Sequence, residues 1–446
     1  MCNGMIDSYV DRFMKMEADH HLFDLRDEEG LPVWDILRYD VNLVYNPFTD
    51  KNPHPVRMTF GKLFRGVAMA AGDFFRLSFR NGRVMIFSNS RYRAADGKLY
   101  DKASQDVTDS FEHPLIVENK HPLDRYQNPV VQDGLTLYKK FHHASKRLPE
   151  SCSAEILKAI EDSFEPGKMT SGALDSLYGS FFLEYSYYKK LFLSKKPEIV
   201  IMTRNGVRKS LIEAAKESGA KVVELQHGRF DRTHLMYSYP EGITIASGLV
   251  APDLFCSFGN YWGTSNMNFP FRNEEVGNSY YAPKKLDVKH DGSLLFISSF
   301  IYGEELSRLA IAFSERHPEV NVTFRLHPNE YYKSDEYAAV FRGFANISVA
   351  KDEEPIDVAM ERCEVVVLIH STVIYEALSR NKKVASYKRM NYDDLSDCFS
   401  NPNVYLVGNG DELYDVISKE TKSCSQSYFE PFNAQKFKSL ISNLTK

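Results

Sequence analysis

The stretch VVVLIHSTVIYEAL at residues 365–378 predicts a buried β-strand that leads directly into a helix. Its first five residues are apolar, which is typical of a parallel strand covered on both faces. Ser371 and Thr372 follow, and their hydroxyls suit the capping position of a helix. Backbone N–H groups and hydroxyls then face an anion at the carboxyl end of the strand. The stretch therefore indicates either a phosphate-binding corner of an open α/β sheet or a plain helix cap.

A second polar strand end lies upstream, in the sequence NVTFRLHPNE at residues 321–330. The run is rich in strand-forming residues, and its proline disfavours helix at the residue before it. Arg325 carries a permanent positive charge, and His327 adds a hydrogen-bond donor. Taken alone, His327 is more typical of a structural histidine. Two polar strand ends in one α/β unit nevertheless predict one shared crevice for a nucleotide phosphate.

The first half of the chain contains a strand, helix and strand pattern that ends in further polar residues. The predicted strands cover 198–203 and 221–226, and the helix between them covers 207–218. The residues that follow the two strands are Arg204, Asn205, Gln226, His227 and Gly228. The glycine permits a turn with positive φ or a close backbone approach. These residues predict one wall of a cleft between two domains.

Strands and helices alternate along the second half of the chain. Strands are predicted at residues 293–299, 320–326, 346–350, 364–369 and 383–388, with helices between them. Such alternation is typical of a parallel sheet with right-handed crossovers. The first 83 residues are mostly helical. We therefore predict an α/β fold of two Rossmann-like domains that face each other across a cleft, with an N-terminal helical extension.

Length and composition agree with two domains. The 446 residues, of which 43% are hydrophobic and 26% charged, suffice for two sizeable cores. A net charge of -5 provides no excess of cations for a phosphate backbone, which argues against a nucleic-acid partner. The six cysteines form no Cys-x-x-Cys pair, as expected of a reducing cytoplasm without structural zinc. Since no Asp-x-Asp pair occurs, we expect no catalytic metal.

Two features of the sequence concern a membrane. The first residues lack the basic and apolar regions of a signal peptide, and no run of about 18 apolar residues occurs, so we expect a cytoplasmic protein. Residues 57–83 carry six basic side chains and one acidic side chain among bulky apolar residues. This pattern suits a helix that lies on an anionic membrane. A core-facing helix pair with solvated charges fits the same segment.

Three motifs occur in order along residues 198–380: Gln226-His227-Gly228, Arg325-Leu326-His327-Pro328, and Ser371-Thr372 with Glu376. In order and spacing they resemble GT-B glycosyltransferases of bacterial surface-polysaccharide synthesis. The His-Pro and Ser/Thr motifs are similar to those of the polysialyltransferases and capsular Kdo transferases, which use CMP-sugars. A His-Gly, an Arg-x-His-Pro and a Ser-rich helix start also occur in the CDP-glycerol glycerophosphotransferases of teichoic acid synthesis.

The resemblance implies a transferase that moves a sugar from a nucleotide-sugar donor to a hydroxyl of a growing O-antigen or capsule glycan. The favoured donor is a CMP-activated ulosonic acid such as sialic acid or Kdo, and no metal or other cofactor is implied. Residues 1–280 would bind a lipid-linked or oligosaccharide acceptor, and residues 281–430 the donor. The helix at 431–446 would pack back on the first domain. The enzyme would work at the inner face of the cytoplasmic membrane.

The resemblance also implies a role for each site residue. The donor phosphate would be bound by Arg325, His327, Ser371 and Thr372, and the ribose by Glu376. His327 would assist the leaving phosphate, and His227 would be the base that takes the proton of the acceptor hydroxyl. The acceptor cleft would be lined by Arg204, Asn205, Gln226 and Gly228. For His227 a residue that only shapes the turn is the alternative, and for Glu376 a solvated helix residue.

Three other functions fit the same residues. A polyol-phosphate transferase that uses CDP-glycerol or CDP-ribitol would share the His-Gly and His-Pro motifs. A nucleotide-sugar 2-epimerase would share the fold but needs no acceptor. A non-catalytic glycan-binding or assembly subunit could keep the fold without the chemistry, and it would then bind nucleotide weakly or not at all.

Overall fold

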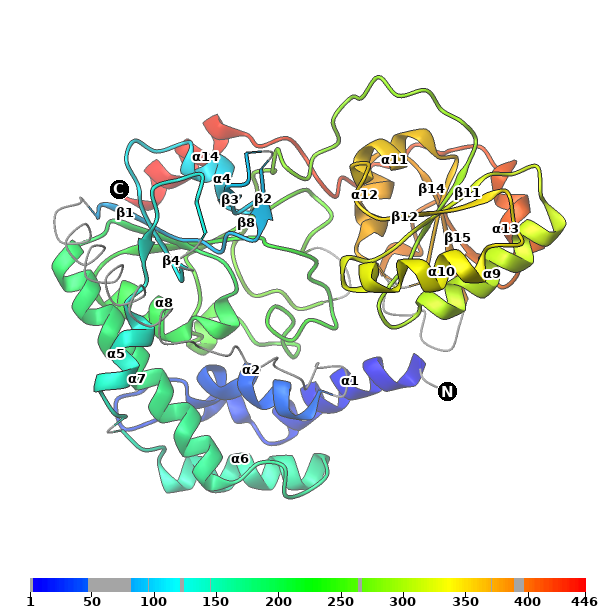
Figure 1. Cartoon of the computed structure of the whole chain (residues 1–446). Coiled ribbons are helices and arrows are strands. Elements are labelled where there is room, and N and C mark those ends of the chain that lie inside the picture. The colour runs from blue at the N-terminus through cyan, green and yellow to red at the C-terminus, as the bar shows by residue number, and fades with distance from the viewer. Residues whose placement is uncertain are drawn as a thin grey trace. The chain divides into compact units, whose positions relative to one another are not determined.

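The computed structural model describes residues 3–46, 82–94, 96–120, 124–144, 146–263, 267–369, 371–388 and 397–446. The chain divides into two compact units, whose elements are labelled in Figure 1. The N-terminal unit consists of Ser8–Phe258, Asn266–Tyr280 and Phe432–Lys446. The C-terminal unit consists of Met1–Asp7, Gly259–Ser265 and Tyr281–Pro431.

The N-terminal unit is built on a parallel sheet with the strand order β5-β4-β1-β6-β7-β8-β9. The strands are β1 Val84–Phe87, β4 Leu115–Glu118, β5 Val131–Gln132, β6 Ile199–Met202, β7 Lys221–Leu225, β8 Leu254–Ser257 and β9 Asn273–Glu275. The strand order reverses between the neighbours β1 and β6: β4 and β5 follow on the side of β1, and β7, β8 and β9 follow on the side of β6. In open α/β sheets, ligands bind at the carboxyl ends of the strands where the order reverses.

The two faces of this sheet bury alternate side chains of its strands. On one face, Ile86 and Ile201 share a core with Phe437 and Ile441 of the C-terminal helix α14 (Ala434–Leu444). On the other face, Phe87 packs against Tyr188 and Phe192 of the long helix α7 (Ser171–Lys195), with ring centroids 5.7 and 6.2 Å apart. The last residues of the chain therefore complete the core of the N-terminal unit (Figure 1).

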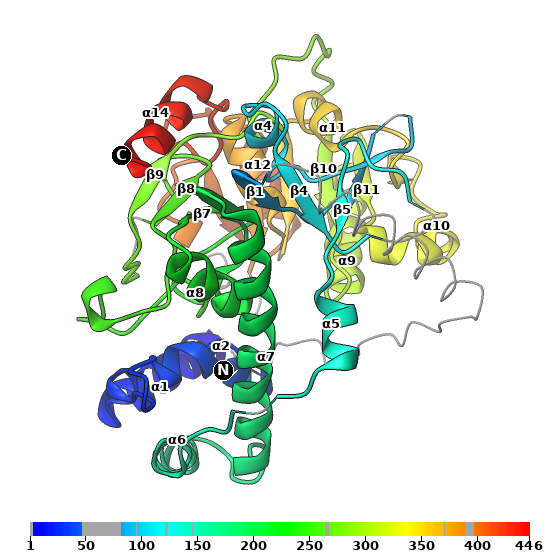
Figure 2. The same ribbon diagram turned by 90° about the vertical axis from the view of Figure 1, so that its left-hand side faces the viewer.

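Further helices surround α7, as Figure 2 shows. Helix α8 (Lys209–Glu217) lies beside it, and α1 (Asn3–Asp19), α2 (Val33–Tyr45) and α6 (Glu150–Ser163) gather near its far end. Smaller elements complete the unit: the hairpin of β2 (Tyr92–Arg93) and β3 (Leu99–Tyr100), α4 (Gln105–Thr108), α5 (Leu135–Phe141), and the 3-10 turns η1 (Leu22–Asp24), η2 (Asn205–Val207) and η3 (Ile245–Ser247).

Two buried ion pairs join α2 to its neighbours. Arg38 lies 2.5 Å from Glu17 of α1, and their side chains are 3% and 0% exposed. Asp35 lies 2.8 Å from Lys209 of α8, and it also accepts the backbone N–H of Val250 at 2.9 Å. Burial lowers the pKa of Lys209. Charges buried this deeply are tolerated only as pairs, so each partner holds the other in place.

Replacing Asp35 with alanine is expected to destabilise the protein by about 3–5 kcal/mol, because Lys209 is then buried without its counter-charge. Urea-induced unfolding of the full chain measures the loss. Asp19→Ala is the control, since it breaks an exposed pair with Lys15 that is worth less than about 1 kcal/mol. Equal losses in the two variants would show that the buried pair has no special role.

The C-terminal unit is built on a second parallel sheet, with the strand order β12-β11-β10-β13-β14-β15. The strands are β10 Leu294–Ile297, β11 Val322–Arg325, β12 Ile347–Ala350, β13 Val365–Leu368, β14 Lys383–Tyr387 and β15 Val404–Val407. Its helices are α9 Gly303–Arg316, α10 Ser334–Val340, α11 Ile356–Arg362, α12 Val373–Ser379 and α13 Gly410–Ile417, and a 3-10 turn, η4, spans Pro328–Lys333. The strand order reverses between β10 and β13.

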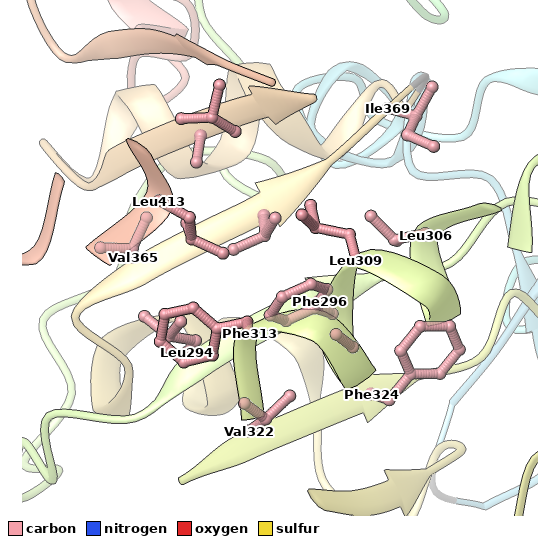
Figure 3. Close-up of a cluster of buried hydrophobic side chains, with 14 of the residues drawn as sticks. Leu294, Phe296, Leu306, Leu309, Phe313, Val322, Phe324, Val365, Ile369 and Leu413 are labelled. Carbon is pink, nitrogen blue, oxygen red and sulfur yellow. The ribbon is translucent and has the colours of Figure 1, made fainter. Parts of the chain in front are cut away.

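The core of this unit fills the space between its sheet and the helices α9, α10 and α13. Figure 3 shows Leu294 and Phe296 of β10 with Phe313 of α9 and Leu413 of α13, all buried. Successive side chains of a strand point to opposite faces of the sheet, and β10 and β13 are apolar throughout. The opposite face is therefore also apolar, and α11 and α12 cover it (Figure 1). Because both faces of the sheet are covered, polar side chains that bind a ligand can be expected at its carboxyl edge.

The predicted class, an α/β fold of two Rossmann-like domains, is confirmed by the two parallel sheets. The cleft between them stays a prediction. Strands β2, β3, β5, β8, β9 and β15 are not among the predicted ones, and β9, with the sequence Asn-Glu-Glu, has no apolar residue that could indicate a strand. The helix predicted between the strands at 320–326 and 346–350 is short, because the Pro-led turn η4 occupies the first part of this interval.

The structure tests only part of the predictions about a membrane. Residues 57–81 of the segment 57–83 lie outside the described residues. In the part of the chain that the structure describes, every helix is too short or too polar to cross a membrane. Contact of residues 57–83 with a membrane therefore stays a prediction.

Candidate functional site

The reversal point of the C-terminal sheet brings two of the predicted motifs to one edge. Strands β11 and β13 lie on either side of β10, and all three run parallel. Arg325 is the last residue of β11, and Ser371 follows β13. The carboxyl end of β10 is continued by Ser298, whose backbone N–H donates to the carbonyl of Arg325 at 2.9 Å. Arg325, Ser298 and Ser371 therefore gather at the edge where such sheets bind ligands.

A buried glutamate that the sequence analysis did not single out organises this edge. Glu330 is 0% exposed, and its carboxylate accepts from the hydroxyl of Ser298 at 2.7 Å and from the hydroxyl of Tyr337 at 3.0 Å. It also accepts from the backbone N–H of His327 at 3.3 Å. A β-carbon at Gly303, the first residue of α9, would collide with Glu330 and Tyr337. Glu330 thus joins the ends of β10 and β11 to α9 and α10.

The geometry of His327 determines which ring nitrogen can donate. Its side chain is exposed, and Nδ1 accepts the backbone N–H of Asn329 at 3.1 Å. A neutral imidazole that accepts at Nδ1 carries its proton at Nε2. His327 therefore offers an N–H donor to solvent at the carboxyl edge, as the binding of a phosphate requires. The same residue caps η4, so the structural role suggested for a lone histidine is also present.

Arg325 is held by one hydrogen bond. Its Nη1 donates to the backbone carbonyl of Glu354 at 2.7 Å, and the side chain is half-buried. This bond uses one of the five N–H donors of a guanidinium, restricts the side chain and leaves the other donors for a ligand. A restricted, partly desolvated guanidinium binds an oxyanion more strongly than a mobile surface arginine, because less side-chain freedom is lost on binding.

The predicted Ser-Thr cap is formed by one of its two members. The hydroxyl of Ser371 accepts the backbone N–H of Val373, the first residue of α12, at 3.3 Å. Thr372 occupies the capping position of α12, as predicted, but it is exposed, has helical backbone angles and makes no capping hydrogen bond from its side chain. Glu376 is half-buried on α12, and its backbone carbonyl accepts from Arg380 at 3.1 Å. The roles of Thr372 and Glu376 toward a ligand stay predictions.

The carboxyl edge of the N-terminal sheet carries the other predicted residues, and two of them are buried. The side chain and backbone N–H of Asn205 donate to Glu224 at 2.8 and 3.0 Å. Gln226 donates to the carbonyl of Gly228 at 2.9 Å and accepts the N–H of Phe258 at 2.8 Å. Asn205 and Gln226 were expected to line a cleft, but both side chains are buried. They stabilise the loops that follow β6 and β7 instead of facing solvent.

Gly228 does not need the conformation expected of it. Its φ lies outside the left-handed region, and a β-carbon added there would meet nothing within 4 Å. The turn after β7 is instead fixed by the side chain of Gln226. The open space beside Gly228 is compatible with the predicted close approach of a ligand, which stays a prediction.

His227 is half-buried beside Tyr237, whose hydroxyl lies 3.4 Å from Nδ1. Burial, together with the positive charges of His234, Arg204 and Arg91, lowers the pKa of His227 to about 3. The ring is therefore neutral at pH 7 and free to accept a proton, as a base must be. A group with so low a pKa is nevertheless a weak base, because catalysis is most efficient when the pKa lies near the working pH.

The low pKa of His227 predicts a loss of stability in acid. Its pKa in the folded chain lies below the ordinary value of 6.5, so the unfolded chain binds more protons between the two values. The contribution to stability is complete above pH 6.5 and is lost as the pH falls from there toward 3. Urea-induced unfolding at a series of pH values should therefore show a steeper decline for the natural chain than for His227→Gln. Parallel declines would contradict the shift.

Arg204 stands out among the predicted residues of this edge. Its φ of 65° places it in the left-handed region, which is unusual for a residue other than glycine. The side chain is half-buried, and among the described residues no hydrogen bond or ion pair engages its guanidinium. Two arginines near this edge, Arg91 and Arg229, were not singled out from the sequence, since their placement depends on which strands are neighbours.

In the part of the chain that the structure describes, His, Cys, Asp and Glu side chains do not gather in groups that could hold a metal ion. The five described cysteines are free, and only Cys424 is not fully buried. Independence of metals and cofactors stays a prediction, since it concerns the reaction.

Comparisons with known proteins give similar folds but no family. No family model matches the chain, and no curated protein matches it. Solved structures that resemble it include the UDP-GlcNAc 2-epimerase of Methanocaldococcus jannaschii, at 13% identity and a TM-score of 0.43 over 81% of this chain and 99% of that one. MurG of Acinetobacter baumannii has 13% identity and a TM-score of 0.41 over the same shares of the two chains.

A third similar structure is the UDP-GlcNAc 2-epimerase of Neisseria meningitidis bound to UDP-GlcNAc. It has 13% identity and a TM-score of 0.43 over 81% of this chain and 99% of that one. With identities this low, the function has to be argued from the residues at the two sheet edges.

Proposed function

We propose that the chain is a glycosyltransferase whose nucleotide-sugar donor binds through its phosphate at the carboxyl edge of the C-terminal sheet. The observation that carries the proposal is the placement of Arg325, His327 and Ser371 around the reversal point between β10 and β13. A cation, an N–H donor and a hydroxyl at this edge are the groups that a leaving phosphate requires. Because Ser371 accepts from Val373, its own hydrogen remains available for donation.

The proposed reaction joins an oxygen of the acceptor to the anomeric carbon of the donor. The hydroxyl oxygen forms the new C–O bond, and the bond between the anomeric carbon and the phosphate oxygen breaks, with its electron pair leaving on the phosphate. Arg325 and His327 would stabilise that growing negative charge. The hydroxyl proton would pass to the neutral ring of His227 and from there to solvent.

The finer proposal concerns the donor and the product. A CMP-activated ulosonic acid, such as sialic acid or Kdo, is favoured because the His-Pro and Ser/Thr motifs resemble those of transferases that use CMP-sugars. The acceptor would be a bacterial surface glycan, of the O-antigen or capsule kind. A single phosphate is the leaving group of such a donor, which suits a site with one arginine and one histidine.

The test of the proposed function is transfer from labelled nucleotide-sugars. The full chain is incubated with CMP-sialic acid, CMP-Kdo, CDP-glycerol, UDP-GlcNAc or GDP-mannose, with and without an oligosaccharide acceptor. Label that reaches the acceptor from a CMP-sugar supports both the class and the donor. Transfer from UDP-GlcNAc or GDP-mannose keeps the class and removes the CMP donor, whereas transfer of a polyol phosphate from CDP-glycerol, or a change in the sugar without acceptor, would overturn the class.

A further inference from the structure

We propose that the carboxyl edge of the N-terminal sheet binds an oxyanion, a phosphate or carboxylate group carried by the acceptor. This inference rests on the proposed function and names the chemical class of its second substrate. Three neighbouring strands, β1, β6 and β7, end at this edge, and each is followed within four residues by an arginine. The three arginines are Arg91, Arg204 and Arg229. The positive charges of these arginines therefore gather at one edge of the sheet, where an oxyanion would be attracted.

The acidic side chains of this edge are already engaged. Glu118, at the end of β4, accepts from the hydroxyls of Ser88 and Ser90 at 2.8 and 2.9 Å. Glu224 is bound by Asn205 and by the hydroxyl of Tyr237 at 2.8 Å. Neither carboxylate pairs with an arginine of the three in the described structure. Both instead hold the loops that carry the arginines.

The three arginines differ in how far they are neutralised. Arg229 forms an ion pair with Asp231, which also accepts from Thr233. Arg91 is attracted to the buried Asp101, whose hydrogen bonds come from Ser104 and from backbone N–H groups. Arg204 has no such partner among the described residues, although it is half-buried. A guanidinium that is partly desolvated and unpaired is the group from which an added oxyanion gains most.

Two histidines lie close to the positive charge of this edge. His227 and His234 lie on either side of Tyr237, with ring centroids 6.5 and 5.0 Å from it. Burial lowers the pKa of both, and the charge of Arg204 adds to the shift in each. Nδ1 of His234 is buried with no hydrogen-bond partner in the described structure. Arg204 therefore contributes positive charge beside both rings, and an anion beside Arg204 would reverse part of the two pKa shifts.

A consequence follows for catalysis. Alone, His227 is a weak base, as its low pKa shows. An acceptor whose phosphate or carboxylate pairs with Arg204 would cancel part of the nearby positive charge and raise the proton affinity of His227. The base would then become effective only when the acceptor is bound. Acceptors without an anionic group near the reacting hydroxyl would leave His227 weak and would be poor substrates.

The experiment uses the full chain with the donor site removed by Arg325→Ala and His327→Ala, so that phosphate bound there does not interfere. Its unfolding temperature is measured against rising inorganic phosphate at constant ionic strength, with sodium chloride as the balancing salt. Arg204→Gln is then added to this background. Arg93→Gln is the matched control, since Arg93 lies in the same unit and is paired with Asp124 at 3.1 Å.

Phosphate is expected to stabilise the background chain, and Arg204→Gln should weaken that apparent affinity about tenfold or more. Arg93→Gln should leave it unchanged. The proposal is overturned if phosphate has no effect on the background chain, or if the two glutamine variants respond alike. The series is repeated with acetate to learn whether the site prefers a phosphate or a carboxylate. Either anion supports the proposal only if its effect depends on Arg204.

A second readout does not depend on stability. The ring signals of His227, assigned by comparison with His227→Gln, are followed through a pH titration by NMR. Phosphate should raise the pKa of His227 in the background chain and leave it unchanged once Arg204→Gln is present. An unchanged pKa in the background chain counts against the proposal. If that happens while CMP still binds the natural chain through Arg325, the acceptor is neutral and the proposed function stands.

Discussion

Replacing His327 with alanine is expected to lower kcat about a hundredfold or more, because one donor to the leaving group is lost in the transition state. The side chain is exposed, and its single structural bond is the capping bond from Asn329. Loss of a capping bond costs about 0.5–2 kcal/mol, so the variant should still fold. Steady-state kinetics with the preferred donor, together with circular dichroism, measure both effects.

The matched control is His290→Ala, which removes a half-exposed histidine of the same unit. His290 lies before β10, at the amino edge of the sheet, and pairs with Glu364 at 3.0 Å. The His290→Ala variant should keep the activity of the natural chain. A decrease in kcat of less than about tenfold in His327→Ala, which corresponds to under 1.4 kcal/mol, would contradict a role for His327 in the transition state.

Glu330→Ala should damage both the fold and the site. Three donors, from Ser298, Tyr337 and the backbone of His327, lose their common acceptor, and each hydrogen bond to a charged group is worth about 1.5–3 kcal/mol. We expect a loss of about 3 kcal/mol or more in the free energy of unfolding, since buried donors are then left unsatisfied. In chains that remain folded, kcat should fall because the His-Pro turn loses its anchor.

Urea-induced unfolding measures the stability, and Glu336→Ala is the control. Glu336 is an exposed residue in the first turn of α10, the helix that follows the turn η4 in which Glu330 lies. Its replacement should change the stability by no more than about 0.5 kcal/mol. Equal stability of the two variants would show that the carboxylate of Glu330 does not organise the edge.

The elements that the sequence predicts well are those with a strong apolar pattern. The run at 365–369 becomes the buried strand β13, and the helix predicted between the strands at 293–299 and 320–326 is α9. Short or polar elements escape prediction, because their strand character comes from pairing with a neighbour. Asn273–Glu275 is a strand only because it continues the edge of the sheet beside β8.

The candidate site could be predicted in part for similar reasons. Arg325, His327 and Ser371 lie at or just after the ends of strands that the apolar pattern predicts, so their common edge could be anticipated. Glu330 could not, since a charged residue after a proline is ordinarily solvated, and its burial depends on Ser298 and Tyr337 reaching it from two other elements. Likewise, Arg91 is placed near Arg204 only by the pairing of β1 with β6.

Binding of CMP to the full chain, measured by isothermal titration calorimetry, tests directly whether the carboxyl edge of the C-terminal sheet holds the donor phosphate. We expect CMP to bind more tightly than UDP, GDP or ADP, and Arg325→Ala to weaken this binding about tenfold or more. Arg316→Ala, which breaks only the exposed pair with Asp411 in the same unit, should bind CMP as the natural chain does. Absence of binding by every nucleotide, or equal affinities of Arg325→Ala and Arg316→Ala, would contradict a phosphate site at this edge.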